Sequence, residues 1–200
     1  MLDFGTTGKL RNSDLVMYDR QTESWWQQFT GEAIVGELTG SELKLVPASL
    51  QSHEQFAAEH PNGQVLIPAN PEARSYGRNP YVAYDAPGKR PFLYGGDLPP
   101  GIGPMERVVA IETSPDRHEA WSIDLVREQS EVRIGDLVIR WRPGQASALD
   151  ASDIAGGREI GTVTVQRETD DGPRAVAFDT PFAFAFYAFR PDSPIHVGPE

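Results

Sequence analysis

The sequence predicts an α+β fold that is predominantly β, built from short antiparallel strands and hairpins with one or two short helices. Two observations support this prediction. Short runs of alternating apolar and polar residues are separated throughout by turn residues, which is typical of antiparallel strands. Only the segment 52–63 carries a complete set of helix start and stop signals.

Residues 1–67 are predicted to form a β-meander followed by a helix. The runs "DLVMYD" (14–19) and "WWQQF" (25–29) are predicted strands, and the polar segment "RQTES" is the turn between them. The runs "EAIVGEL" (32–38) and "ELKLVPA" (42–48) continue the meander, because Thr-Gly turns precede both of them.

The predicted helix of this section is "HEQFAAEH" (53–60). Ser52 is a favourable N-cap, and Gln55 follows at the spacing of a capping box. The Pro-Asn-Gly sequence at 61–63 ends the helix, because proline cannot continue the hydrogen-bond ladder and Asn-Gly favours a turn. A short strand, "QVLIP" (64–68), is expected next.

Residues 68–104 are predicted to form one long ordered loop rich in proline and glycine. A solvated linker would contain few apolar residues, but this segment carries several aromatic residues. They are Tyr76, Tyr81, Tyr84, Phe92 and Tyr94. We expect the loop to pack over a sheet, and long ordered loops often carry function.

Residues 105–200 are predicted to form a second β-rich section of the same single domain. The expected strands are "ERVVAIE", "HEAWS", "EVRI", "LVIRWRP", "TVTVQRE" and "RAVAFD". A short helix is expected at "SIDLVREQ" (122–129), and Asp-Asp-Gly at 170–172 is a hairpin turn signal. The phenylalanines of "PFAFAFYAF" (181–189) fit either a strand face or a helix face, and both remain open.

A short internal echo offers a further alternative for the architecture. The segment "LDFGTT" (2–7) resembles "VAFDTP" (176–181), and a hairpin strand leads only into the second copy. The echo favours two similar half-domains, the first of them truncated.

The composition excludes several classes of function. The chain has no cysteine, which excludes disulfides, thiolate metal sites and cysteine nucleophiles. A formal charge of −11 without a basic run argues against a nucleic-acid partner. No export signal is present, and the longest apolar run is far shorter than the ~20 residues of a membrane span. We therefore expect a soluble chain, and the sequence indicates no particular oligomeric state.

No metal or cofactor site is predicted. His53 and His60 share one face of the predicted helix, but seven residues separate them by roughly 10 Å along the helix. One zinc ion cannot bind both side chains at that distance. A Gly-x-Ser-x-Gly elbow and a phosphate-binding Gly-x-x-x-x-Gly-Lys loop are both absent from the sequence.

Two segments carry the candidate ligand-binding residues. The first supplies Asn12, Asp19, Trp25 and Gln27, and the second supplies Tyr76, Arg78 and Asn79. The predicted function is a non-enzymatic module in which both segments form a polar-aromatic pocket for a small or anionic ligand. The purely structural interpretation is that the hairpin aromatics form a core, Asp19 is a turn residue and Arg78 anchors its loop.

An enzymatic alternative also remains open. In this alternative, a hydrolase or lyase uses Asp14 or Asp19 as a general base, and Arg78 anchors an anionic substrate.

Six segments together resemble the prokaryotic domain-of-unknown-function family 3179. They occur in the expected order and cover nearly the whole chain. They are "FGTTGKLRNSDLVMYDRQTESWWQQFTGEAIVGEL", "HPNGQVL", "YGRNPYVAYD", "LPPGIGPMERVVAI", "PGQASALD" and "FAFYAFRPDSPIH". The resemblance implies little about activity. It does imply an extracytoplasmic location and a Cys-Pro-x-Cys section ahead of the first segment, which this cysteine-free chain lacks.

Overall fold

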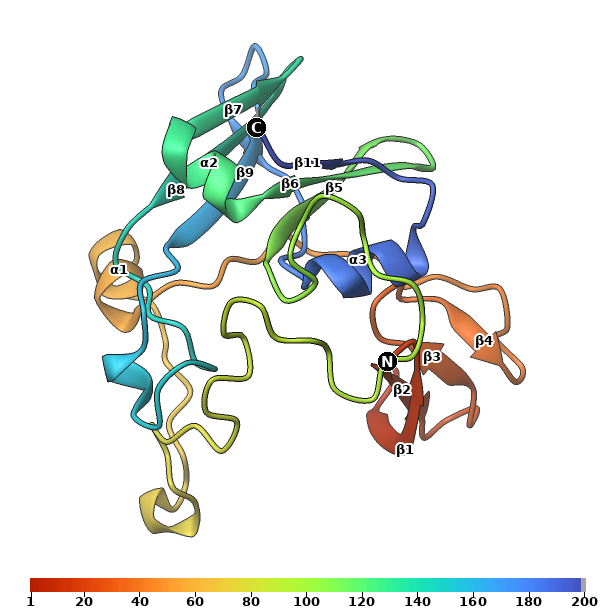
Figure 1. Cartoon of the computed structure of the whole chain (residues 1–200). Coiled ribbons are helices and arrows are strands. Elements are labelled where there is room, and N and C mark those ends of the chain that lie inside the picture. The colour runs from red at the N-terminus through yellow and green to blue at the C-terminus, as the bar shows by residue number, and fades with distance from the viewer. Residues whose placement is uncertain (199–200) are drawn as a thin grey trace.

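Short amphipathic runs pair mainly with their neighbours along the chain, and this produces three small sheets instead of one large sheet (Figure 1). The structure is a computed structural model that describes residues 1–198. Within that range three α-helices accompany the sheets, and all sheet pairings except one are antiparallel. The predicted α+β, predominantly β class is confirmed.

The first sheet is a four-stranded meander of residues 4–35. Its strands are β1 (Phe4–Arg11), β2 (Asp14–Asp19), β3 (Trp25–Gln27) and β4 (Ala33–Val35), in that order across the sheet. Asn12 and Ser13 join β1 to β2 with φ values of 52° and 65°. Two consecutive positive φ values match the twist of a tight hairpin, and Asn tolerates this conformation well.

The helix α1 (His53–Glu59) begins with the predicted capping box. The Ser52 hydroxyl accepts a hydrogen bond from the Gln55 amide, and the Gln55 side chain accepts one from the Ser52 amide. The same Gln55 side chain also bonds the Thr162 hydroxyl at 2.7 Å and the Pro143 carbonyl at 2.7 Å. One residue thus starts the helix and ties it to the second β-rich section.

Two predicted strands of the first section are wrong. Glu42 forms only an isolated bridge with Glu32, residues 43–48 and 64–68 are irregular, and Val46 and Leu66 are exposed. Alternation alone does not form a strand, because a partner edge must also be present. The prolines at 47 and 68 also lack the N–H that a ladder needs.

The second and third sheets form the larger part of the fold. Across one sheet the strands are β11 (Ile195–His196), β6 (Arg117–Ser122) and β5 (Val108–Ser114). Across the other sheet they are β10 (Arg174–Ala175), β9 (Thr162–Arg167), β8 (Leu137–Arg142) and β7 (Glu131–Ile134). The helix α2 (Ile123–Gln129) connects them and buries Leu125 and Val126. Val109, Ile139 and Val165 belong to the core cluster that α2 closes.

The ambiguous aromatic run forms the helix α3 (Ala183–Phe189). Phe186 is buried in a second cluster with Val108 and Ala120, so the helix packs on the β5–β6 pair. Phe189 stacks on Phe29 with ring centroids 4.8 Å apart. The helix therefore connects the first sheet to the rest of the molecule, as Figure 1 shows.

The long loop is anchored by a few buried residues along its length. Asn79 and Asp85 are buried, and Tyr94 packs against Phe184 at 5.1 Å between ring centroids. The expected aromatic packing is only partly realised, because Tyr81 is 63% exposed and Phe92 is 69% exposed. The loop is held by polar contacts as much as by its aromatic rings.

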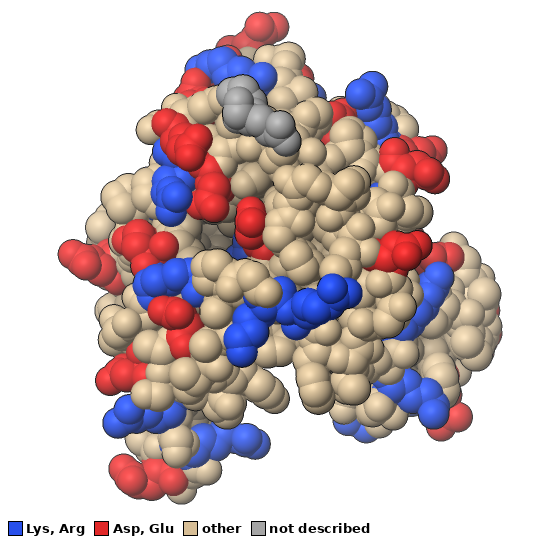
Figure 2. All heavy atoms as spheres, in the orientation of Figure 1, with Lys and Arg blue, Asp and Glu red and all other residues tan. Residues whose placement is uncertain are grey.

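The surface mixes both signs of charge. Figure 2 shows basic and acidic side chains interspersed over the visible face. Within residues 1–198, the helices are all too short to cross a bilayer.

Candidate functional site

Asp19 is the centre of the β2–β3 turn and has no exposed surface. Its carboxylate accepts hydrogen bonds from the Trp26 indole N–H at 2.9 Å and from the Thr22 amide at 2.6 Å. The Thr22 hydroxyl and the Gln21 amide donate to the same carboxylate. Because these donors occupy its oxygens, the geometry favours the turn interpretation of Asp19 over the role of a general base.

The same hydrogen bonds determine the acidity of Asp19. Burial by itself raises the pKa of this carboxyl, but the bonds from Trp26 and Thr22 outweigh burial and lower the pKa to about 2. The ionised form is therefore favoured in the folded state.

Acid is expected to weaken the fold through Asp19. The folded pKa of about 2 lies below the ordinary value of 3.8, so the contribution of this group is fully present above pH 3.8. It is lost as the pH falls through the folded pKa. Urea midpoints measured at several pH values should fall more steeply in the wild type than in Asp19→Asn. Parallel curves for the two proteins would contradict this assignment.

The other predicted residues of the hairpin also make internal contacts. Asp14 accepts hydrogen bonds from the Gln27 side chain at 2.6 Å and the Phe29 amide at 3.0 Å, and burial raises its pKa despite them. The Asn12 side chain donates to the Ala188 carbonyl of α3 at 3.0 Å. These contacts fix the hairpin against the rest of the fold.

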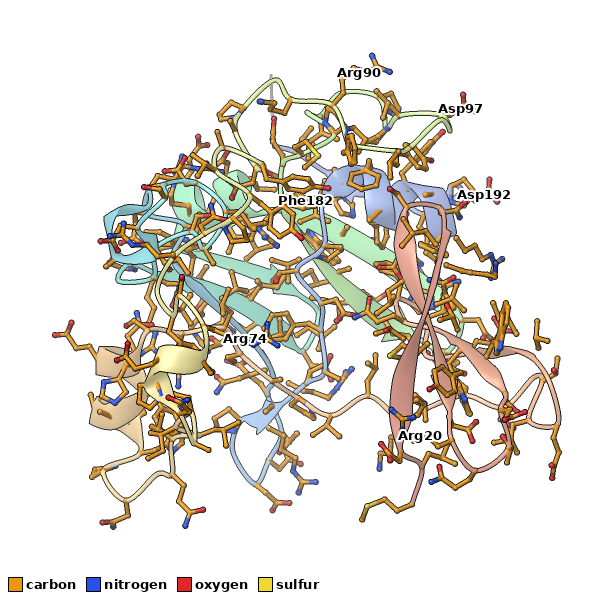
Figure 3. All side chains as sticks on the ribbon, turned by 90° about the horizontal axis from the view of Figure 1, so that it is seen from below. Arg20, Arg74, Arg90, Asp97, Phe182 and Asp192 are labelled. Carbon is orange, nitrogen blue, oxygen red and sulfur yellow. The ribbon has the colours of Figure 1, made fainter. Side chains whose placement is uncertain are left out.

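The predicted residues of the long loop lie elsewhere. Arg78 forms an isolated β-bridge with Asp153, and the Asn79 side chain donates to the Ala151 carbonyl at 3.2 Å. Tyr76 is 56% exposed. Figure 3 shows Arg74, two residues before Tyr76, well away from Arg20 at the β2–β3 turn. The structure therefore does not bring the two predicted halves of the pocket together.

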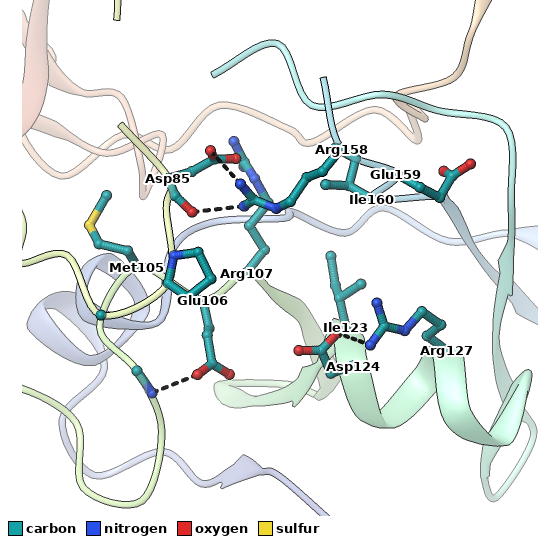
Figure 4. Close-up of a pocket in the computed structure, with 13 residues that line it drawn as sticks. Asp85, Met105, Glu106, Arg107, Ile123, Asp124, Arg127, Arg158, Glu159 and Ile160 are labelled. Atoms are coloured by element: carbon teal, nitrogen blue, oxygen red, sulfur yellow. Dashed lines mark hydrogen bonds and ion pairs between the residues drawn. The ribbon is translucent and has the colours of Figure 1, made fainter. Parts of the chain in front are cut away.

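A different cavity, of about 260 Å³, lies between the end of this loop and the start of α2 (Figure 4). We call it the Arg107 cavity. Its charged lining residues are Asp85, Glu106, Arg107, Asp124, Arg127, Arg158 and Glu159. Met105, Ile123 and Ile160 supply much of the apolar lining.

Asp85 and Arg158 form the upper wall of the cavity in Figure 4. The Arg158 guanidinium donates to the Asp85 carboxylate at 3.0 Å and to the Asp85 carbonyl at 2.7 Å. It also pairs with Asp150 at 3.2 Å, while the Ser147 hydroxyl donates to Asp85 at 2.6 Å. The charge of Arg158 is thus balanced within the protein.

Arg107 differs from its neighbours, because its charge has no carboxylate partner within residues 1–198. One terminal nitrogen donates to the Thr180 carbonyl at 2.9 Å, and the guanidinium lies 4.5 Å from the Phe182 ring centroid. Its Nε is buried and makes no hydrogen bond in the described part of the chain. Burial lowers the pKa of Arg107 and the nearby Asp85 raises it, but arginine stays protonated in proteins.

The remaining charged groups of the cavity have partners. Arg127 pairs with Asp124 at 2.9 Å. Glu159 accepts hydrogen bonds from three backbone amides, which lower its pKa although burial acts in the opposite direction. Glu106 accepts one from the Gly103 amide at 3.1 Å. Among the charged residues that line the cavity, Arg107 is therefore the cation whose charge is available to a ligand.

Sequence reasoning missed most of this site. Asp85 ends the segment "YGRNPYVAYD" that it singled out, but Arg107 and Arg158 carry no local motif. Their pairing depends on contacts 73 residues apart, which only the folded chain reveals. Among residues 1–198, no group of three or more acidic or histidine side chains is placed to hold a metal ion.

Comparison with known families identifies the chain. Residues 1–193 match a family described as "Protein of unknown function (DUF3179)". The chain belongs to the DUF3179 family. The resemblance seen in the sequence is thereby confirmed. No curated protein and no solved structure matches this DUF3179 chain, so its function must be argued from its own geometry.

Proposed function

We propose that this DUF3179 protein is a non-enzymatic binding module, and that the Arg107 cavity holds a small molecule through its carboxylate or phosphate group. The observation that carries this proposal is the Arg107 guanidinium, which lines the cavity and has no carboxylate partner in residues 1–198. We keep the small or anionic ligand expected from the sequence, but we propose this cavity as its site instead of a pocket between the hairpin and residues 76–79.

The energetics favour an anion at this position. A ligand oxyanion beside the guanidinium would neutralise its charge and accept hydrogen bonds from its terminal N–H groups. The Thr180 carbonyl and the Phe182 ring already hold the guanidinium in place, so little side-chain entropy is lost on binding.

The size and lining of the cavity indicate the kind of ligand. A volume of about 260 Å³ lies just below the range typical of drug-sized ligands, which favours a small metabolite. Ile123, Ile160 and Met105 supply an apolar surface for the rest of the molecule.

The same lining supports binding over catalysis. Asp85, Glu159 and Asp124 are all engaged by protein donors, and none of them is positioned as a free general base. The enzymatic alternative has less support, because Asp14 and Asp19 make internal contacts in the first sheet and Arg78 lies on the distant loop.

Thermal unfolding in the presence of inorganic phosphate, succinate and citrate tests the proposal. A ligand at 100 times its Kd stabilises the folded state by about 2.7 kcal/mol. We expect such stabilisation in the wild type and in the control Arg174→Gln, which alters an exposed pair with Asp171. Arg107→Met keeps the apolar contact with Phe182 and should lose the effect.

Arg107→Lys is the companion variant, because it retains the charge but lacks the planar fork. We expect it to fold and to bind the anions more weakly than the wild type. Equal stabilisation of the wild type and both Arg107 variants would overturn the proposal.

A further inference from the structure

A second cavity, of about 450 Å³, lies between the residues that follow the first sheet, the β5–β6 pair and α3. We call it the Asp179 cavity. Phe29, Leu43 and Phe186 supply apolar side chains to its lining. Asp179, His118 and Arg190 add polar groups to it, and no residue of the Arg107 cavity takes part.

Strand pairing places the polar groups of this cavity on one face of the sheet. Asp179 pairs with Ala110 on one side of β5, and His118 pairs with Glu112 on the other side. Paired residues point to the same face, and so do residues two apart on one strand. Asp179 and His118 therefore face the same space, two strand spacings apart across the sheet and two residues apart along it, or roughly 12 Å.

Asp179 has a carboxylate without a protein partner. Within residues 1–198 it forms neither an ion pair nor a side-chain hydrogen bond, although its backbone pairs with Ala110 at 2.9 and 3.0 Å. The residue is exposed to solvent, yet desolvation by the surrounding protein raises the pKa of its carboxyl. A cationic or donor group entering the cavity would stabilise the ionised carboxylate.

Arg190 supplies the opposite charge in the lining of the same cavity. It follows the last turn of α3, and the described chain provides no carboxylate partner for its guanidinium. Burial and Arg190 lower the pKa of His118, while Glu112, Glu42 and Asp116 act in the opposite direction. Arg190, His118 and Asp179 all line this cavity and come from different segments of the chain.

We propose that the Asp179 cavity binds a small zwitterion whose amino group pairs with Asp179 and whose acid group pairs with Arg190. Its two charges are separated by an apolar chain that lies on the phenylalanine lining. His118 lines the same cavity and can donate a hydrogen bond to the acid group. Glu42, Lys44 and Glu112 also line the cavity, and water screens their charges because their side chains are exposed.

The test is calorimetric titration of the full chain with 4-aminobutanoate, 6-aminohexanoate and 8-aminooctanoate. We expect saturable binding of at least one of them. Hexanoate and hexylamine each lack one charge, and they should bind about 10- to 100-fold more weakly than 6-aminohexanoate if that is the ligand length selected. Asp179→Asn and Arg190→Gln should show losses of similar size, and circular dichroism would verify their folding.

Arg107→Met separates this site from the proposed anion site. It should bind the amino acids as the wild type does, even if it no longer responds to phosphate. The proposal is overturned if none of the three amino acids binds saturably to the wild type. It is also overturned if Asp179→Asn and Arg190→Gln bind them with unchanged affinity.

Discussion

Trp26→Ala is expected to destabilise the protein by about 3–5 kcal/mol, the usual cost of removing a buried tryptophan. Trp26 is only 2% exposed and meets the Phe4 ring edge to face at 5.9 Å between centroids. Its indole N–H is also one of the donors that hold the buried Asp19 carboxylate. The variant therefore loses core contacts and leaves Asp19 with fewer donors. Urea unfolding monitored by circular dichroism measures the change.

Trp25→Ala is the matched control for this prediction. Trp25 is the adjacent residue on β3, but it is only half-buried and faces the opposite side of the sheet. We expect it to cost clearly less than Trp26→Ala. An equal or larger loss in Trp25→Ala would contradict the assignment of Trp26 as the core residue of the first sheet.

Asp85→Ala is expected to destabilise the protein by about 3 kcal/mol, which is the lower end of the usual cost of breaking a buried ion pair. Asp85 is 2% exposed and receives hydrogen bonds from Ser147 and Arg158. Arg158 is partly exposed, so water recovers some of its lost interaction. Because these contacts tie the long loop to residues 147–158, amide exchange in the loop should also become faster.

A double-mutant cycle isolates the pair itself. Arg158→Ala leaves a buried Asp85 carboxylate with one partner fewer, so both single variants lose the same interaction. The double variant should be more stable than the sum of the two losses predicts. Strictly additive losses would show that Asp85 and Arg158 are not coupled.

Local signals in the sequence predicted the local structure well. The capping box of Ser52 and Gln55 starts α1 as expected, and the turn at 170–172 joins β9 to β10. These features depend on residues within a few positions of each other, so the sequence contains the whole interaction. The expected strands at 42–48 and 64–68 failed because pairing partners are a tertiary property.

In the candidate site, too, the local contacts could be predicted from the sequence and the tertiary contacts could not. Asp19 and Thr22 form a turn that their spacing already indicated. Arg107 and Arg158, in contrast, resemble any other arginine in the sequence. They acquire distinct roles only because Arg158 meets Asp85 while Arg107 meets a carbonyl and an aromatic ring. A pattern of charges cannot reveal which cation is left without a partner.

The most direct test of the central claim is the side-chain Nε–H signal of Arg107 in the NMR spectrum of protein with isotope-labelled arginine. The signal is assigned by its loss in Arg107→Lys, and the wild type is titrated with phosphate, succinate and citrate at constant ionic strength. We predict that at least one anion shifts this signal along a saturating curve while the signal of the exposed Arg174 stays in place. An Arg107 signal that stays unchanged, or that drifts linearly together with that of Arg174, would contradict the claim that Arg107 binds an anion.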